Sequence, residues 1–241
     1  MSSGEHLMLN SLEELATTII SCKKCPRLVH YRVYVAEKRP KRYLKDEYWA
    51  KPIPSFGDPN ARLLIVGLAP AAHGGNRTGR MFTGDGSANT LMRALYFVGY
   101  ASQPYSIHKD DGLRLKDAYL TAVVRCVPPK NMPSKEEIKN CSAYLKNELF
   151  LLKNVKAIVA LGMVAFNTCV KILSELGVKM PRPSPKFSHG AVYKLEGELF
   201  GRAAPSLIAS YHPSRQNTQT GRLTQSMLNN IFKKAKQLTL V

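Results

Sequence analysis

Four short apolar runs, each followed by a polar loop, are spread through the chain. They are LLIVGLAP from Leu63, AYLTAVV from Ala118, VKAIVALG from Val155 and SLIASYH from Ser206. Near-continuous apolar runs of this length are typical of strands that are buried on both faces of a parallel sheet. The pattern therefore predicts four central strands.

Apolar positions at helical spacing predict helices between and after these runs, over residues 87–98, 135–152, 163–176 and 224–238. Ser134-x-x-Glu137 is a capping box before one of them, and Ser11-x-x-Glu14 opens an earlier helix that ends near Cys22. Strands that alternate with helices predict an α/β three-layer sandwich, in which a mostly parallel four-stranded sheet is flanked by helices.

Residues 190–203, GAVYKLEGELFGRA, predict a hairpin that turns near Gly197.

Hydrophobic residues make up 44% of the 241 residues, which is enough for a core and excludes a disordered chain. No long linker divides the chain, so we expect one domain over residues 1–241, with the basic, cysteine-bearing residues 1–60 packed onto it. No apolar run reaches the ~18 residues of a membrane span, and the N-terminus lacks a secretory pattern, so we expect a cytoplasmic protein that acts at no membrane.

Three polar loops begin where predicted strands end. They are GLAPAAHGGNRTGRMFTGDGSA, RCVPPKNMPS and YHPSRQNTQTGRLT. Because ligands of open α/β sheets bind at the carboxyl ends of the strands, we expect these loops to converge on one site. The first loop is neither a Walker A loop, since Arg80-Met81 stands where Lys-Ser/Thr is needed, nor a dinucleotide fingerprint. Its cations, its single acid and Phe82 suit a nucleotide better than a lone phosphate.

The formal net charge of +18 indicates a polyanionic partner, for which nucleic acid is a better candidate than a membrane surface. The excess is concentrated near both ends of the chain. Residues 23–51 hold ten Lys/Arg and three acids, and six Lys/Arg without any acid follow Glu198. In YRVYVAEKRPKRYLKDEYW the basic residues alternate with aromatic ones, a mixture that suits contact with phosphates and bases.

Four of the five cysteines have a spacing that indicates a metal site. Cys22 and Cys25 form a C-x-x-C, and Cys126 and Cys141 follow far downstream, where Cys141 lies on the inner face of a predicted helix. In a reducing compartment, metal binding or redox chemistry is a better interpretation than disulfides. Four thiolates suit either zinc or a [4Fe–4S] cluster, and the spacing does not choose between them. Cys169 lies on an apolar helix face and is interpreted as a core residue.

The three loop motifs together resemble those of the family 5 uracil-DNA glycosylases. The C-x-x-C-P-R of residues 22–27, with Cys126 and Cys141, resembles the iron–sulfur cysteines of families 4 and 5. The resemblance extends from about Cys22 to the C-terminal helix. It implies an α/β sandwich, a thermophilic source, a structural [4Fe–4S] cluster and excision of uracil and other deaminated bases, such as hypoxanthine, from DNA.

The resemblance also implies roles for particular residues. Asp85 and His212 would be catalytic, with His212 donating to uracil O2, and Phe82 would stack on the extruded base. The backbone of Gly67, Leu68 and Ala69 would line the base pocket, Asn131 would bind the base edge, and His73 would share this work. The DNA contacts would come from Arg77, Arg80, Ser214, Arg215, Gln216 and Asn217.

Simpler interpretations of these residues stand beside the catalytic ones. Asp85 is well placed to cap the helix that starts near Ser87. His212 precedes Pro-Ser and Asn131 precedes Met-Pro, so both also fit an interpretation as turn residues. For the whole chain, the alternatives are a non-catalytic nucleic-acid-binding module with structural zinc and a family 4-type enzyme that is specific for uracil. We expect a monomer associated with the nucleoid, with the C-terminal tail as a place where a sliding clamp could dock.

Overall fold

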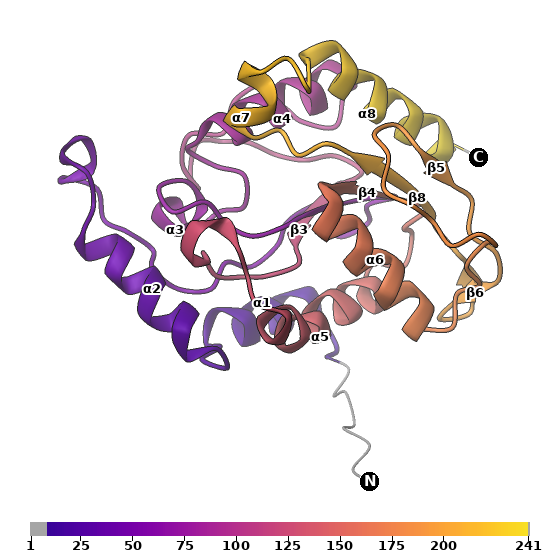
Figure 1. The fold of residues 1–241 in the computed structure, drawn as a ribbon, viewed down its shortest axis with the longest axis horizontal. Coiled ribbons are helices and arrows are strands. Elements are labelled where there is room, and N and C mark those ends of the chain that lie inside the picture. The colour runs from indigo at the N-terminus through magenta and orange to yellow at the C-terminus, as the bar shows by residue number, and fades with distance from the viewer. Residues whose placement is uncertain (1–8, 241) are drawn as a thin grey trace, which may run out of the picture.

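A six-stranded sheet forms the centre of the computed structural model, which describes residues 9–240 (Figure 1). The strand order is β1-β3-β2-β4-β8-β5. The four inner strands are parallel and match the four predicted runs: β2 (Leu63–Gly67), β3 (Ala118–Ala122), β4 (Ala157–Leu161) and β8 (Ser206–Ser210). Two short antiparallel strands, β1 (Phe56–Gly57) and β5 (Val192–Tyr193), extend the predicted sheet at its edges.

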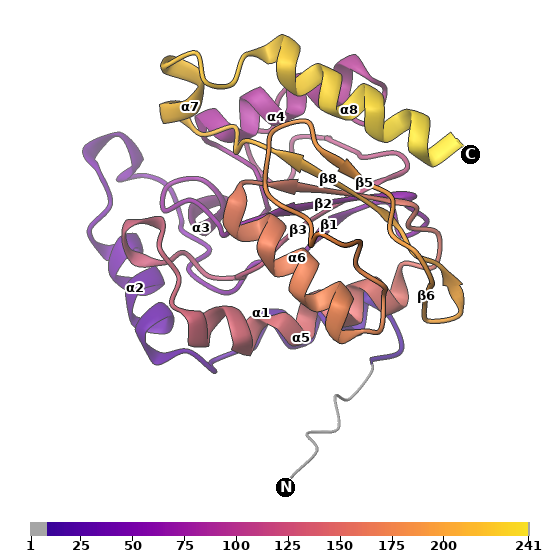
Figure 2. The same cartoon turned by 45° about the vertical axis from the view of Figure 1, so that its right-hand side comes forward.

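Helices cover both faces of the sheet, which confirms the predicted sandwich (Figures 1 and 2). One face carries α4 (Gly86–Phe97) and α8 (Gln225–Leu240), which pack on the side chains of Leu63, Ile65, Val159 and Ile208. The other face carries α1 (Leu12–Ile20), α5 (Lys135–Leu151) and α6 (Met163–Glu175), which pack on Leu64, Val66, Ile158 and Leu207. Successive strand residues point to opposite faces, so the buried apolar side chains of the inner strands alternate between these two cores.

The helix boundaries follow the capping signals in the sequence. Ser134 accepts a hydrogen bond from the backbone of Glu137, whose carboxylate returns one to the backbone of Ser134, so the capping box of α5 is complete. At α1 the Ser11 side chain caps Glu14 in the same way, but the Glu14 carboxylate binds the backbone of Asn10 instead. Side-chain caps of this kind satisfy backbone donors that a helix leaves unpaired.

The predicted hairpin near Gly197 is wrong in position. The structure forms it from β6 (Glu198–Leu199) and β7 (Arg202–Ala203), with Phe200 and Gly201 at the turn. Both turn residues have positive φ angles, 53° and 74°, as a two-residue hairpin turn requires. Glycine at position 201 makes this turn easier to form. The first part of the predicted hairpin, β5, pairs with β8 instead.

The N-terminal region packs onto the sandwich, with Leu15, Ile19 and Leu28 buried in the same core as the sheet residues. It contains a helix that the apolar pattern did not predict, α2 (Pro26–Glu37), followed by the short helix η1 (Lys41–Tyr43). Two further short helices, α3 (Gly75–Thr78) and α7 (Arg215–Gln219), lie in predicted loops, and η2 (Pro129–Asn131) follows β3. Within residues 9–240, no helix has the length and apolar content to cross a membrane.

Candidate active site

The loops that follow β2, β3 and β8 meet at the carboxyl edge of the sheet, as predicted. Backbone bonds join the first two, because the N–H groups of Val123 and Val124 donate to the carbonyls of Gly67 and Leu68 at 3.0 and 2.9 Å. Residues from the three loops line one large outer cleft of about 620 Å³, and a smaller inner pocket of about 40 Å³ opens beside it. Asp85 lines both.

Phe82 and His212 form the aromatic part of the inner pocket. Their ring centroids are 6.1 Å apart and the planes differ by 30°. The Phe82 ring lies against Gly67, where an added β-carbon would be 2.8 Å from the ring, so glycine at position 67 is needed for this packing. Ala69 also lines the pocket, whereas Leu68 is not among the described residues that line either cavity.

Burial lowers the pKa of His212 to about 4, so its imidazole is neutral at neutral pH. A neutral imidazole still carries one N–H that can donate a hydrogen bond. The Asn217 amide donates to the His212 carbonyl at 2.8 Å, and His189 Nδ1 accepts from the Tyr211 backbone at 3.1 Å. These two bonds hold the backbone on both sides of the His212 ring.

Asp85 caps α4, as its position before Ser87 indicated. Its Oδ1 accepts a hydrogen bond from the Ala88 backbone at 2.9 Å. Burial raises its pKa, and the backbone bonds and the charge of Arg77 oppose this shift only in part. The other carboxylate oxygen lies against Gly74, where an added β-carbon would come within 2.0 Å of Asp85 Oδ2. Because the cap uses Oδ1, the second oxygen, Oδ2, is the one that lies beside Gly74 at the cavities.

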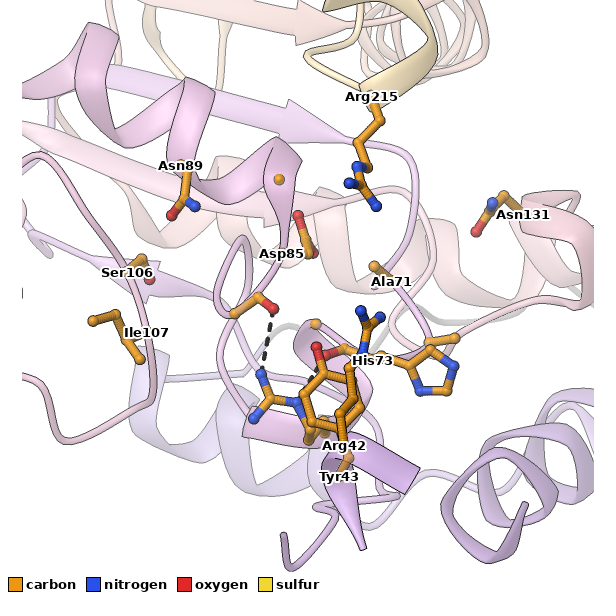
Figure 3. Close-up of a pocket in the computed structure, with 15 residues that line it drawn as sticks. Arg42, Tyr43, Ala71, His73, Asp85, Asn89, Ser106, Ile107, Asn131 and Arg215 are labelled. Carbon is orange, nitrogen blue, oxygen red and sulfur yellow. Dashed lines mark hydrogen bonds between the residues drawn. The ribbon is translucent and has the colours of Figure 1, made fainter. Parts of the chain in front are cut away.

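The outer cleft carries the remaining polar groups. In Figure 3, Arg42 and Tyr43 face Arg215 across Asp85, and Asn131 lies at one side. His73 also lies in this cleft, where its Nδ1 is 2.8 Å from the Tyr48 hydroxyl. Burial and the neighbouring arginines lower the pKa of His73. His73 and Asn131 thus line the outer cleft rather than the inner pocket, and a direct contact of either with a base stays a prediction.

Two arginines that were expected to contact DNA are engaged inside the protein. Arg80 is 5% exposed and binds Thr83, Ser106 and both oxygens of Asp111. The expectation that Arg80 contacts DNA is therefore corrected, because its guanidinium is enclosed and fully engaged in this loop. Arg77 is also largely buried and pairs with Asp46 at 2.6 Å.

The loop after His212 begins with a cap and presents a cation. The Ser214 hydroxyl accepts a hydrogen bond from the Asn217 backbone and starts α7. Arg215 and Gln216 are exposed, and the Arg215 stem lies against Gly86, where an added β-carbon would be 3.1 Å away. Ser214 and Asn217 hold the local backbone, whereas Arg215 and Gln216 are exposed, and a contact of either with DNA stays a prediction.

The outer cleft includes residues that the sequence did not single out. Arg42 and Tyr43 belong to the basic and aromatic segment, but nothing in that segment distinguished them from their neighbours. Tyr43 lies beneath two guanidinium groups, with Arg42 and Arg77 at 4.8 and 4.4 Å from its ring centroid. Ile107 also lines the cleft, and no motif surrounds it in the sequence.

The four candidate metal-binding cysteines are neighbours in space. Cys126 and Cys141 are buried in the core beside α1 and α5, and Cys22 and Cys25 pack against that core. Burial raises the pKa of Cys126 to about 11, and the nearby Cys22 and Cys25 add to this shift. Among the described residues, however, no group of three or more His, Cys, Asp or Glu side chains is arranged as a metal site.

The surroundings of these thiols fit an anionic group. Arg32 is 6% exposed, and its Nη1 donates to Cys126 Sγ at 3.2 Å. Its Nε is buried and has no hydrogen-bond partner within residues 9–240. A buried cation of this kind is costly unless a negative charge lies nearby. The donor set of four thiols and the adjacent guanidinium therefore fit a thiolate-bound metal or cluster.

The sequence profile of the Uracil DNA glycosylase superfamily matches residues 54–236, three quarters of the chain and all three site loops. The chain belongs to this superfamily of DNA glycosylases. Similar proteins include the type-5 uracil-DNA glycosylase of Thermus thermophilus, 47% identical over 226 residues that cover 94% of this chain and 97% of that protein. The type-5 uracil-DNA glycosylase of Pyrobaculum aerophilum is 44% identical over 223 residues, 92% of this chain and 91% of that protein.

Type-4 members of the superfamily are more distant. The type-4 uracil-DNA glycosylase of Pyrobaculum aerophilum is 26% identical over 204 residues, 84% of this chain and 83% of that protein. The resemblance to family 5 is therefore confirmed, and the alternative of a non-catalytic binding module is excluded by the superfamily match.

Proposed function

We propose that this glycosylase removes uracil, and also other deaminated bases such as hypoxanthine, from DNA by hydrolysis of the N-glycosidic bond. The observation that carries the proposal is the inner pocket, where an aromatic ring, a neutral imidazole and a carboxylate meet at the carboxyl edge of the sheet. A pocket of this composition offers a stacking surface, a hydrogen-bond donor and a negative charge to an extruded nucleotide. The type-5 relatives, which are named uracil-DNA glycosylases, support the uracil part of the proposal.

His212 acts on the departing base. Breakage of the N-glycosidic bond leaves negative charge on the base, and the neutral His212 ring donates a hydrogen bond to the oxygen that carries it. Because the ring is already enclosed and held in place, this donor needs little reorganisation as the charge develops. Loss of one preorganised donor of this kind typically costs roughly 3–4 kcal/mol of activation free energy.

Asp85 acts on the sugar. Its Oδ1 is engaged by the helix cap, so Oδ2, beside Gly74, is the oxygen that faces the reacting nucleotide. The ionised carboxylate stabilises the oxocarbenium-like sugar and orients the attacking water, as carboxylates do in glycoside hydrolysis. The absence of a side chain at Gly74 allows the carboxylate to occupy this position.

The outer cleft and the surface charge serve the extrusion of the base. Extrusion costs a few kcal/mol, and least for a mispaired base, so uracil opposite guanine is an easier target than uracil opposite adenine. Phosphate contacts from Arg42 and Arg215 offset part of this cost, and the net charge of +18 makes binding depend steeply on salt.

The thiols of Cys22, Cys25, Cys126 and Cys141 would hold a [4Fe–4S] cluster, with zinc as the alternative. Such a cluster would supply structural cross-linking between the end of α1, α5 and the loop after β3. Arg32 would balance its negative charge. Quantification of iron, acid-labile sulfide and zinc in the purified protein tests this assignment, and one zinc per chain without iron would contradict the cluster.

Single-turnover assays on duplexes with one defined lesion test the proposed activity. We expect release of free base and an abasic site from uracil-containing and hypoxanthine-containing duplexes without added metal or nucleotide. His212→Gln and Phe82→Ala should lower the excision rate far more than DNA affinity. A purified, folded protein that leaves uracil and hypoxanthine duplexes intact would contradict the proposal.

The protein's surroundings in the cell are part of the same proposal. We expect a monomer in the cytoplasm, associated with nucleoid DNA, since one chain supplies the aromatic ring, the imidazole and the carboxylate of the inner pocket. The exposed end of α8 is the place proposed for a sliding clamp.

A further inference from the structure

A groove between α5 and α6 is separate from the site of the reaction. Its volume is about 710 Å³, and none of the residues that line it lines the outer cleft or the inner pocket. Figures 1 and 2 show the two helices side by side, on the face of the sheet opposite to α8. The proposed excision of a base makes no use of this groove.

The floor of the groove is a row of side chains along one face of α6. Val164, Thr168 and Ile172 follow one another at intervals of four residues, and Ile138 and Ala143 of α5 line the other side. Val164 is 40% exposed, whereas Ile172 is buried at the bottom. The Thr168 hydroxyl donates to the Val164 carbonyl at 2.8 Å, so it needs no partner from outside the helix. The floor is therefore an apolar surface that is open to solvent at Val164.

Lysines form the walls of the groove. The charged residues that line it are Lys24, Lys135, Lys139, Lys146, Lys171 and a single acid, Glu175. Lys146 binds Glu175 across the groove at 2.8 Å, and Lys171 lies 3.8 Å from the same carboxylate. The other three lysines are exposed and make no ion pair within residues 9–240. The part of the groove beside the start of α5 thus carries three positive charges without a matching acid.

The two helices contribute equal lengths to the groove. Its lining extends from Lys135 to Lys146 on α5 and from Val164 to Glu175 on α6. At a rise of 1.5 Å per residue each stretch is about 17 Å long, which matches roughly three turns of a third helix. Apolar grooves of this kind bind amphipathic helices, whose apolar side chains enter at positions i, i+3 or i+4, and i+7.

We propose that this groove is a docking surface for an acidic amphipathic helix of a partner protein. Apolar side chains of the partner cover Val164 and the floor beneath it, and its carboxylates pair with Lys135, Lys139 and Lys24. Since the interface is small, the complex is weak and reversible. The inference does not depend on the excision activity, because no residue of the groove takes part in it.

Charge complementarity selects this occupant over a second copy of the chain and over DNA. With 35 Lys+Arg against 17 Asp+Glu, a second copy would bring further positive charge to a positive groove. DNA would satisfy the lysines but not the floor, because its phosphates gain nothing from an apolar surface. No aromatic side chain on which a base could stack is among the described residues that line the groove.

Fluorescence anisotropy of a labelled synthetic peptide, titrated with the full-length protein, tests the docking surface. The probe is a helix-forming peptide of about four turns, with Leu at positions i, i+4 and i+7 and Glu on both flanks of this row. A second peptide has the same composition in scrambled order, so it keeps the charge and loses the apolar face. We expect a Kd in the micromolar range for the probe and binding about tenfold weaker or less for the scrambled peptide.

Variants of the groove locate the binding. The double variant Lys135→Glu/Lys139→Glu reverses two charges of the wall, and glutamate at position 135 is favourable in the first turn of α5. Val164→Ser removes the exposed part of the floor. Each should weaken binding of the probe about tenfold. Lys233→Glu is the matched control, because it reverses an exposed charge on α8, across the sheet, and should keep the wild-type Kd. Thermal unfolding and uracil excision should match the wild type in all three variants.

Four results would overturn the docking surface. Two of them are equal binding of the ordered and scrambled peptides, and wild-type binding of the probe by the double variant. The third, a loss of affinity for undamaged duplex DNA in the double variant without any effect on the peptide, would assign the groove to DNA. The fourth, a dimer in sedimentation that Val164→Ser dissociates, would assign it to a second copy. Because the peptide assay contains no DNA, a failure of the excision assay would leave this proposal standing.

Discussion

Asp85→Asn separates the two roles that the structure gives to one carboxylate. Asparagine is as good an N-cap as aspartate, so the hydrogen bond from Oδ1 to the Ala88 backbone, 2.9 Å in the structure, should persist. The variant removes only the negative charge that faces the nucleotide. A loss of about 3 kcal/mol of transition-state stabilisation corresponds to a single-turnover rate more than a hundredfold lower.

The effect on stability should have the opposite sign. Because burial raises the pKa of Asp85, the folded protein takes up this proton at a higher pH than the unfolded chain does. The ionised form therefore costs stability above the folded-state pKa, and the neutral asparagine removes this cost at neutral pH. We expect Asp85→Asn to be as stable as the wild type or more stable, whereas Asp85→Ala loses the cap and about 1 kcal/mol.

The assays are single-turnover excision from a uracil·guanine duplex as a function of pH, and thermal unfolding of the same proteins. The wild-type rate should fall as the pH drops through the raised pKa of Asp85, and the low residual rate of Asp85→Asn should lack this dependence. An Asp85→Asn variant that keeps the wild-type rate across this range would refute the catalytic role and leave Asp85 as a cap alone.

Three further predictions follow from buried contacts. The folded-state pKa of His212 is about 4, below its pKa in the unfolded chain. The free energy of unfolding should therefore fall by up to about 3 kcal/mol as the pH drops from about 6.5 to 4. Urea unfolding should show that His212→Gln lacks this loss. Gly74→Ala would place a β-carbon 2.0 Å from Asp85 Oδ2, so excision should fall strongly while DNA affinity, measured by fluorescence anisotropy, stays near wild type. Arg80→Ala leaves the Asp111 carboxylate buried and unpaired, so it should lower the free energy of unfolding by about 3–5 kcal/mol; a stable variant with weaker DNA binding would instead restore Arg80 as a DNA contact.

Arg77 and Arg80 show why the sequence alone does not reveal which cations are available to contact DNA. The sequence placed Arg77 and Arg80 in a loop at the ligand edge, where a cation suggests a phosphate contact. The folded loop turns both guanidinium groups inward to Asp46 and Asp111, which are distant in sequence. A count of charged residues in the sequence treats a solvated cation and a cation that is paired inside the protein alike.

Local patterns predicted most of the fold. The apolar runs predicted β2, β3, β4 and β8, and the capping box at Ser134 predicted the start of α5, because strand burial and helix capping depend on residues close in sequence. The helix α2 was missed because it carries basic and aromatic residues on most of its surface and has only a weak apolar face. The hairpin was misplaced because two residues of positive φ decide where it turns.

The sequence by itself determined that three polar loops, which carry Phe82, Asp85 and His212, meet at the carboxyl edge of a parallel sheet. Only the tertiary structure decided which loop residues face the cleft, because that depends on partners far away in the chain. It pairs Arg80 with Asp111, places Gly74 against the Asp85 carboxylate and exposes Ile107 at the rim. Periodicity depends on neighbours a few residues apart, whereas the direction of a side chain is set by what packs against it.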